Sequence, residues 1–155
     1  MAPEDWATIV VGIKHPAMSQ GALRWALEQA RVFGKTLVPI QAYPGPDVET
    51  WPVLQTVPKE AQRAEAMAAL DRAVDALGGD LQGVDIRPEV VEGRPVPVLV
   101  ARSARADLLV LGSRRARSRA TPRPISVASQ CIQLSACPVV VVPVRRREVA
   151  EAAGS

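Results

Sequence analysis

The chain has 155 residues, a formal net charge of +3 and a hydrophobic fraction of 48%. This length suits one domain that buries about two thirds of its unfolded surface, so no disulfide or metal is needed to hold the fold. No apolar run approaches the roughly 20 residues of a membrane span, and the acidic start, Met-Ala-Pro-Glu-Asp-Trp, differs from a secretory signal. We therefore expect a cytoplasmic protein without membrane contact, with one domain over residues 1–147 and a disordered tail over residues 148–155.

Strands and helices alternate in the first part of the chain. Residues 8–13 form a β-branched run that predicts a buried strand, and residues 36–42 predict a second strand, in which Pro39 removes one ladder donor. Between them, Ser19 is placed to cap a helix that ends at Gly34. The apolar face of this helix comprises Leu23, Ala26, Leu27, Ala30 and Phe33.

The same alternation continues beyond a proline-containing loop over residues 43–57. A helix is predicted from Pro58 to Leu77, because Pro58 suits a first turn and two glycines follow the end. Its apolar face comprises Met67, Leu70, Val74 and Leu77. The remaining predicted elements are strands over 85–91, 108–111 and 139–142, a helix over 96–104 with Val96, Leu99 and Val100 inward, and a helix over 126–134 capped by Ser126.

Buried strands separated by helices predict an α/β fold, a three-layer sandwich of a parallel sheet with helices on both faces. Right-handed crossovers restrict the topology, and a five-stranded order of 3-2-1-4-5 places a switch point between strands one and four. Ligands bind such sheets at the carboxyl ends of the strands beside the switch point. Here these ends are residues 13–15 and 112–114, and the second leads through a loop into the helix that opens at Ser126, where free N–H groups and the helix dipole favour an anion.

The charged residues are unevenly distributed. Ten arginines and one acid, Asp107, lie between Ala101 and Arg147, whereas acids outnumber bases between Tyr43 and Val100. This asymmetry indicates either an anionic partner for the C-terminal part or a solvated basic rim.

The sequence offers no metal site and no catalytic constellation. Cys131 and Cys137 match no metal-binding spacing and are expected to be small buried hydrophobic residues. His15 is the single histidine, and no nucleophile-elbow sequence accompanies it. Asp107 lies at the wrong end of its strand to serve as a metal ligand or general base at the loop. We therefore expect a protein that is not an enzyme, with no catalytic residue and no metal.

Several segments resemble the universal stress protein family, in the expected order over residues 7–144. Val10-Val-Gly-Ile13 and the helix after it are similar to the first strand–helix unit of that family, and Glu89-Val-Val-Glu-Gly93-Arg-Pro95 resembles its third strand and turn. Residues 106–114 and 137–143 are similar to its fourth and fifth strands. The resemblance implies the 3-2-1-4-5 sheet of the adenine nucleotide alpha hydrolase-like fold.

The resemblance also implies a homodimer paired through the last strand. A valine run at the edge of a sheet invites such pairing, because its outer backbone groups have no partner within the chain. The expected interface residues are Val139, Val140, Val141 and Val142.

The phosphate loop departs from the family pattern. Members that bind ATP carry Gly, two residues, Gly, nine residues, then Gly and Ser or Thr, and these positions fall here on Gly112, Arg115, Ile125 and Ser126. The aspartate that usually closes the first strand is Lys14 in this chain. Because arginine and isoleucine do not adopt positive φ cheaply, we expect that the glycine cradle is not built and that the ATP-binding motif is degenerate.

An anion at this position would still meet a defined set of residues. Lys14 and the arginines of residues 114–123 could clamp it with charge-assisted hydrogen bonds or could be solvated, and Ser126 could contact it or only cap its helix. The candidate nucleotide- or anion-binding residues are Ile13, Lys14, Ala42, Gly112, Ser113, Arg114, Arg115, Ser126 and Val127.

Two functions fit these features. The first is a non-catalytic, homodimeric domain of bacterial stress response or signalling, with a degenerate nucleotide site and no cofactor. The second is a sensor that still binds ATP or another phosphorylated or anionic ligand through the basic loop at the switch point. A nucleic-acid partner is disfavoured, because one Phe and one Tyr offer little surface for base stacking. The sequence identifies neither the signal nor the downstream partner, nor a role for the arginines at 145–147.

Overall fold

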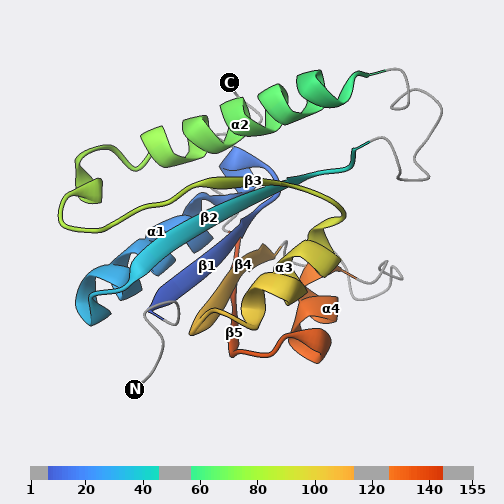
Figure 1. Ribbon diagram of the computed structural model, residues 1–155. Coiled ribbons are helices and arrows are strands. Elements are labelled where there is room, and N and C mark those ends of the chain that lie inside the picture. Colours follow the sequence, from blue (N-terminus) through green and yellow to red (C-terminus); the bar gives the residue numbers. More distant parts are fainter. Residues whose placement is uncertain (1–6, 46–56, 114–125, 145–155) are drawn as a thin grey trace.

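The computed structural model describes residues 7–45, 57–113 and 126–144. Its five parallel strands form one sheet in the order β3-β2-β1-β4-β5, which confirms the predicted topology (Figure 1). The strands are β1 (Thr8–Ile13), β2 (Thr36–Tyr43), β3 (Glu89–Glu92), β4 (Leu108–Ser113) and β5 (Val139–Pro143). The helices are α1 (Pro16–Phe33), α2 (Lys59–Asp75), α3 (Pro95–Ser103) and α4 (Val127–Leu134), with a short 3-10 helix, η3, at Gly78–Leu81.

The sequence predicts a disordered C-terminal tail and no membrane contact. The expected tail over residues 148–155 lies outside the described residues. Within the described part of the chain, none of the helices has the length and apolar character that crossing a bilayer requires.

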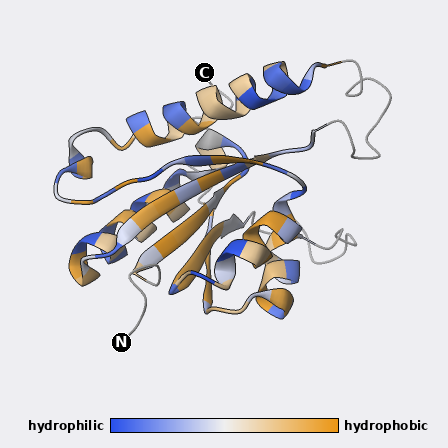
Figure 2. Ribbon diagram, in the orientation of Figure 1, coloured by the Kyte–Doolittle hydropathy of each residue, from blue (hydrophilic) through white to orange (hydrophobic). Residues whose placement is uncertain are grey.

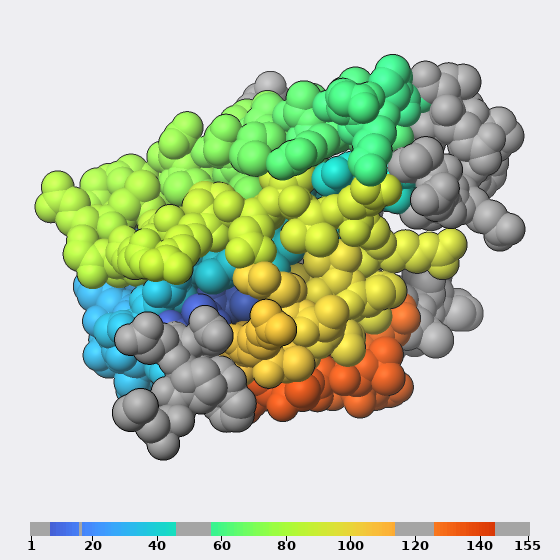
Figure 3. Space-filling model, in the orientation of Figure 1, coloured from blue at the N-terminus to red at the C-terminus, as the bar shows by residue number. Residues whose placement is uncertain are grey.

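The sheet divides the core into two halves, and each half is covered by two helices. Alternate residues of a strand point to opposite faces. Ile9 and Val11 of β1 therefore pack under α1 and α2, while Val10 packs under α3 and α4. Figure 2 shows apolar strands between helices whose outer surfaces carry polar residues, and Figure 3 shows that little of β1 is visible from this side. These layers form the predicted three-layer sandwich.

Pro39 interrupts the ladder between β2 and β3. An isolated bridge joins Leu37 to Ile86, and the continuous ladder begins only at Glu89. The common register places Pro39 opposite Pro88. The Arg87 N–H donates to β2, so the backbone groups of Pro88 point away from β2, and the donor that this ladder lacks is the N–H of Pro39. The predicted strand over 85–91 therefore starts too early, because the missing donor breaks the ladder just before β3.

The same geometry explains why Pro39 is tolerated in a central strand. Both backbone groups of Leu37 bond toward the segment that precedes β3. Pro39 lies two positions after Leu37, so its backbone groups also face β3. The missing N–H of Pro39 therefore weakens the ladder to β3 and leaves the ladder to β1 intact.

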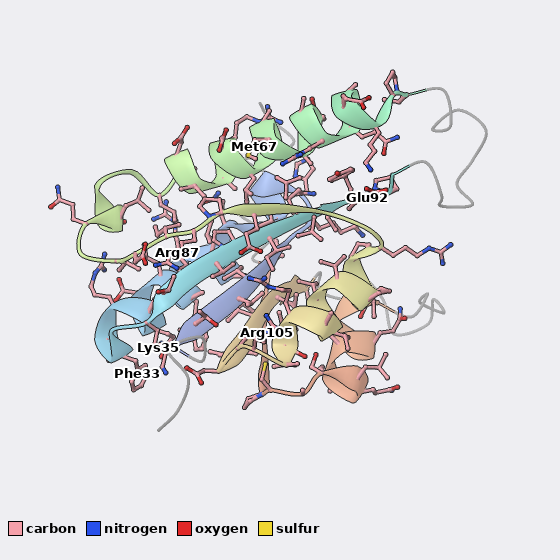
Figure 4. The ribbon with its side chains drawn as sticks, in the orientation of Figure 1. Phe33, Lys35, Met67, Arg87, Glu92 and Arg105 are labelled. Atoms are coloured by element: carbon pink, nitrogen blue, oxygen red, sulfur yellow. The ribbon has the colours of Figure 1, made fainter. Side chains whose placement is uncertain are left out.

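Helix α1 begins at Pro16 and its N-cap is His15, four residues before the predicted N-cap Ser19. Proline suits the first helical turn, because its φ is already helical and its N–H would have no partner there. Ser19 lies inside the helix, so the prediction that it is the N-cap is wrong. Gly34, with φ of 63°, ends the helix as predicted. Phe33 was expected on the apolar face but is 64% exposed, because it is the last residue and lies at the outer end of α1 (Figure 4).

Helix α2 is held to the sheet by few large side chains. Leu70 is fully buried, together with the small side chains of Ala66 and Ala73. Met67 was predicted on the same face but is 37% exposed, because the buried stripe runs through Ala66 and Met67 lies at its border (Figure 4). The helix ends at Asp75, slightly before the predicted end.

Helix α3 buries a different pair of residues from the predicted set. Val98 and Leu99 are buried, whereas Val96 and Val100 are half-buried. Leu99 was predicted to point inward, and Val98 was not.

Truncation of Leu70 tests how α2 is held. We expect Leu70→Ala to lower the free energy of unfolding by about 2–5 kcal/mol, because it leaves a cavity between α2 and the sheet. Met67→Ala removes a side chain of similar size from the same helix and should cost no more than about 1 kcal/mol, because that side chain is partly in water already. Denaturant-induced unfolding measures both values, and equal losses would contradict this account of α2.

Candidate functional site

The carboxyl ends of β1 and β4 lie side by side in the middle of the sheet. The two strands are parallel neighbours in a register that pairs Val11 with Val110. The chain leaves β1 toward α1, which covers one face, and the next helix after β4 is α4, which covers the other face. This divergence is the switch point predicted from the sequence.

The turn between β1 and α1 is fixed by its own hydrogen bonds. The hydroxyl of buried Ser19 accepts from the Lys14 N–H at 3.3 Å. The N–H groups of Met18 and Ser19 both donate to the carbonyl of His15 at 3.0 Å, and Pro16 has no N–H. Because these amides are used or missing, the turn presents mainly the exposed side chains of Lys14 and His15 to solvent.

Gly112 allows the first turn of α1 to lie close to the end of β4. A Cβ at this position would come within 2.9 Å of the carbonyl oxygen of Met18. That oxygen belongs to the backbone, so it can move away only if α1 shifts. The sequence comparison treats Gly112 as the first glycine of a phosphate motif, but the structure requires glycine here for packing, whether or not a phosphate binds.

The N-terminus of α4 forms the other side of the site. Ser126 is the N-cap, as predicted, and its hydroxyl accepts from the Ser129 N–H at 3.1 Å. The hydroxyls of Ser126 and Ser129 lie 3.0 Å apart, so one donates to the other. Both residues are exposed, and the helix dipole makes this end favourable for an anion. The sequence analysis missed Ser129, although its spacing of three residues from the cap places it on the same side of the helix.

The nine predicted site residues fall into three groups. Ile13 and Ala42 belong to the core, where Ile13 is 4% exposed and Ala42 packs against the half that α3 and α4 cover. Arg114 and Arg115 lie outside the described residues. The residues that the structure places at the carboxyl end of the central strands are Lys14, Gly112, Ser113, Ser126 and Val127.

The part of this sheet end that β1, β4 and β5 form differs in charge from the part that β2 and β3 form, where Glu92 pairs with Lys59. The described residues that end β1, β4 and β5 and begin α1 and α4 include the ammonium of Lys14 and the imidazole of His15, and they include no carboxylate. Within the described part of the chain, no cluster of three or more His, Cys, Asp or Glu side chains is placed to hold a metal ion. The site therefore attracts anions and offers no ligand set for a divalent cation.

A second polar cluster holds the ends of β2 and β3 to the start of α2. The Nζ of Lys59 lies 2.5 Å from the carboxylate of Glu92, and the hydrogen bond and charge of that carboxylate raise the pKa of Lys59. The Gln62 side chain accepts from the Gly45 N–H at 3.1 Å and donates to the Val57 carbonyl at 3.0 Å. The ion pair joins β3 to α2, and the Gln62 contacts join α2 to the residues after β2 and before α2, so this cluster has a structural role.

Neither cysteine is suited to nucleophilic chemistry. Cys131 is fully buried on the inner face of α4, and Cys137 is half-buried. Burial raises the pKa of both thiols, so the reactive thiolate is disfavoured at neutral pH.

The two edges of the sheet differ in their capacity to pair with another chain. The Pro138 carbonyl and the Val144 N–H both bond to β4, at 3.0 and 2.8 Å. Alternate residues face the same way, so Val139 and Val141 point their backbone groups away from β4. The other edge, β3, has only four residues and carries two ion-paired glutamates. Short, charged edges resist pairing, whereas β5 is an uncharged valine run.

A parallel sheet of this order, with its switch point between β1 and β4, defines a doubly wound α/β domain. The family model described as the universal stress protein family matches residues 6–143. The chain belongs to the universal stress protein family.

Curated relatives support this assignment. A universal stress protein of Mycobacterium tuberculosis is 29% identical over 146 residues, which cover 90% of this chain and 49% of the relative. A universal stress protein of Mycolicibacterium smegmatis is 26% identical over 140 residues, which cover 86% of this chain and 47% of the relative. The chain spans about half the length of the curated relatives it matches.

Solved structures share the fold. A universal stress protein in complex with cAMP is 28% identical, with a TM-score of 0.57 and coverage of 90% of this chain and 98% of that one. A family protein from Burkholderia pseudomallei is 26% identical, with a TM-score of 0.64 and coverage of 92% and 100%. The universal stress protein from Archaeoglobus fulgidus in complex with dAMP is 23% identical, with a TM-score of 0.62 and coverage of 86% and 95%, and supports the fold.

Substitution of Gly112 tests its packing role. We expect Gly112→Ala to lower the free energy of unfolding by about 1–3 kcal/mol, because the added methyl group forces α1 away from β4. Gly79→Ala is the control, since a Cβ there meets no atom within 4 Å, and it should change stability by no more than about 0.5 kcal/mol. Thermal or denaturant unfolding gives both values, and a Gly112→Ala variant as stable as the parent would show that the contact is not constrained.

Proposed function

We propose that this protein is a non-catalytic universal stress protein domain that binds a nucleotide or a related phosphorylated small molecule at the carboxyl ends of β1 and β4. The observation that carries the proposal is the joint position of Lys14 and the capped N-terminus of α4 beside the ends of β1, β4 and β5, where the described residues carry no carboxylate. The relative solved in complex with cAMP, at 28% identity over nearly the whole chain, supports a nucleotide as the ligand class.

The proposed mode of binding relies on charge and on a helix N-terminus instead of a glycine-rich cradle. Of the three glycines in the phosphate motif, only Gly112 is present, and its place is accounted for by packing. The other two positions, Arg115 and Ile125, lie outside the described residues, so the degenerate motif stays a prediction from the sequence. If the charged end binds nothing, the protein is a stress-response domain whose nucleotide site is empty.

The absence of catalysis is part of the proposal. The described residues around the switch point supply no carboxylate that could act as a general base, and both thiols are held in the protonated form by burial. A domain of this kind acts by changing its ligand state and its contacts, and we place it in the cytoplasm, in bacterial stress response or signalling.

We also propose a homodimer in which two copies of β5 pair about a two-fold axis. The outward backbone groups of Val139 and Val141 would find partners in the second copy, and the four half-buried valines of this strand would lose their remaining contact with water. The charges on β3 argue against pairing through the opposite edge.

Calorimetric titration with cAMP, AMP and ATP tests the ligand proposal. We expect saturable binding of at least one of them with a stoichiometry of one per chain. Ser126→Asp should weaken that binding by about tenfold or more, because aspartate is a good N-cap but places a negative charge where the anion would lie. Ser126→Asn is the matched control, since asparagine caps equally well without the charge and should retain most of the affinity.

The contrary outcomes of that titration are clear. No heat with any of the three nucleotides, confirmed by unchanged thermal stability in their presence, would leave the stress-response domain with an empty site. Binding that Ser126→Asp does not weaken would place the nucleotide elsewhere on the molecule.

A proline at the outer edge tests the dimer. Val141→Pro removes an N–H that faces away from β4, so the chain should fold but sediment as a monomer where the parent sediments as a dimer. Val141→Ala shortens the same side chain and keeps the N–H, and it should remain largely dimeric. Analytical ultracentrifugation at micromolar concentration measures both, with circular dichroism to verify folding. A monomeric parent, or a dimeric proline variant, would exclude pairing through β5.

A further inference from the structure

Lys14 differs from the other two lysines of the chain in its surroundings. Lys35 pairs with Asp107 at 2.5 Å, and Lys59 pairs with Glu92 at the same distance. Among the described residues, Lys14 makes no ion pair, and its side chain is exposed at the end of β1. Its backbone, in contrast, is held by the hydrogen bond from its N–H to buried Ser19. A fixed turn thus carries a cation that has no described partner within the protein.

The surroundings of Lys14 determine which form of a nucleotide it favours. In water, a nucleoside triphosphate exists either as the free anion or as its magnesium complex, in which the metal cancels two negative charges. A bound Mg²⁺ keeps several waters and prefers carboxylates nearby. The described ends of β1, β4 and β5 have no carboxylate, and Glu92 at the end of β3 is paired with Lys59. The ammonium of Lys14 repels a divalent cation.

We propose that Lys14 is a specificity-determining residue that makes this site select the metal-free nucleotide, so that Mg²⁺ weakens the binding of ATP. This inference rests on the proposed nucleotide-binding function and adds the ionic form of the ligand. The ammonium of Lys14 takes the position of the counter-cation at the phosphates, and the N-terminus of α4 contributes the dipole from the other side.

The inference has a consequence for ligand choice. A cyclic monophosphate such as cAMP carries one negative charge and binds Mg²⁺ poorly, so its affinity should not depend on the metal. ATP loses charge when it binds Mg²⁺, so its affinity should fall. The ratio of the two affinities, with and without metal, therefore reports the electrostatics of the site separately from its shape.

The test is a calorimetric titration of the full chain with ATP and with cAMP, at constant ionic strength, in excess EDTA and in excess MgCl₂. We expect ATP to bind about threefold to tenfold more tightly in EDTA, which is the range for a charge pair that is partly screened by water. The affinity for cAMP should be equal in both buffers. Lys14→Gln, which keeps most of the side-chain length, should weaken ATP in EDTA by a similar factor and abolish its dependence on Mg²⁺.

Arg105→Ala is the matched control for net charge. Arg105 is exposed near the amino end of β4, the opposite end of the sheet from Lys14 (Figure 4). Its backbone carbonyl, which accepts from the Thr8 hydroxyl at 3.0 Å, is unaffected by the substitution. This variant removes one positive charge and should leave the Mg²⁺ effect on ATP as in the parent.

The outcomes separate this inference from the function on which it rests. If ATP binds more tightly with Mg²⁺, or if Lys14→Gln behaves as the parent, Lys14 does not select the metal-free form, while nucleotide binding that Ser126→Asp weakens would keep the proposed function. If no nucleotide binds in either buffer, the proposed function fails and this inference fails with it. An Mg²⁺ effect that Arg105→Ala also removes would assign it to net charge and overturn the role of Lys14.

Discussion

The close approach of α1 to β4 at Gly112 joins the two sides of the switch point. The carbonyl of Met18 lies where a side chain on β4 would begin, so α1 can take this position only because that residue is glycine. The helix starts at Pro16, directly after β1, and its position therefore fixes the turn that carries Lys14. The buried hydroxyl of Ser19 holds the same turn through the Lys14 N–H. A turn that is already ordered loses less backbone entropy when a ligand binds, which favours binding. The proposed preference for anions comes from the charge of the Lys14 ammonium on that turn.

Much of the fold is predictable from local patterns in the sequence. Apolar runs predicted the strands, and the alternation of strands and helices with right-handed crossovers predicted the sheet order. The start of β3 was not predictable in this way, because it depends on the missing N–H of Pro39 facing the segment before β3. Ser19 was misassigned for a related reason: a serine that caps a helix and a serine buried in its first turns look alike until the helix start is known.

The candidate site shows the same limit of sequence reasoning. The switch point and the capping role of Ser126 were predicted, since both follow from element order and helix signals. The packing role of Gly112 was hidden, because it depends on the carbonyl of Met18, which is distant in the sequence. Ile13 is buried and the half-buried Ala42 packs against the core, and their assignment to the site stays a prediction.

The unequal edges of the sheet limit how many copies of the chain can join. Each chain has one edge, β5, that is open to pairing, while β3 is short and carries two glutamates in ion pairs. In the language of polymer chemistry, such a chain has a valence of one. When two such chains pair, each uses its single open edge, so the dimer is closed and cannot grow into a fibre. Removal of the charges on β3 would raise that valence to two, because each chain of the proposed dimer would then present an open β3 edge onto which a third chain could add.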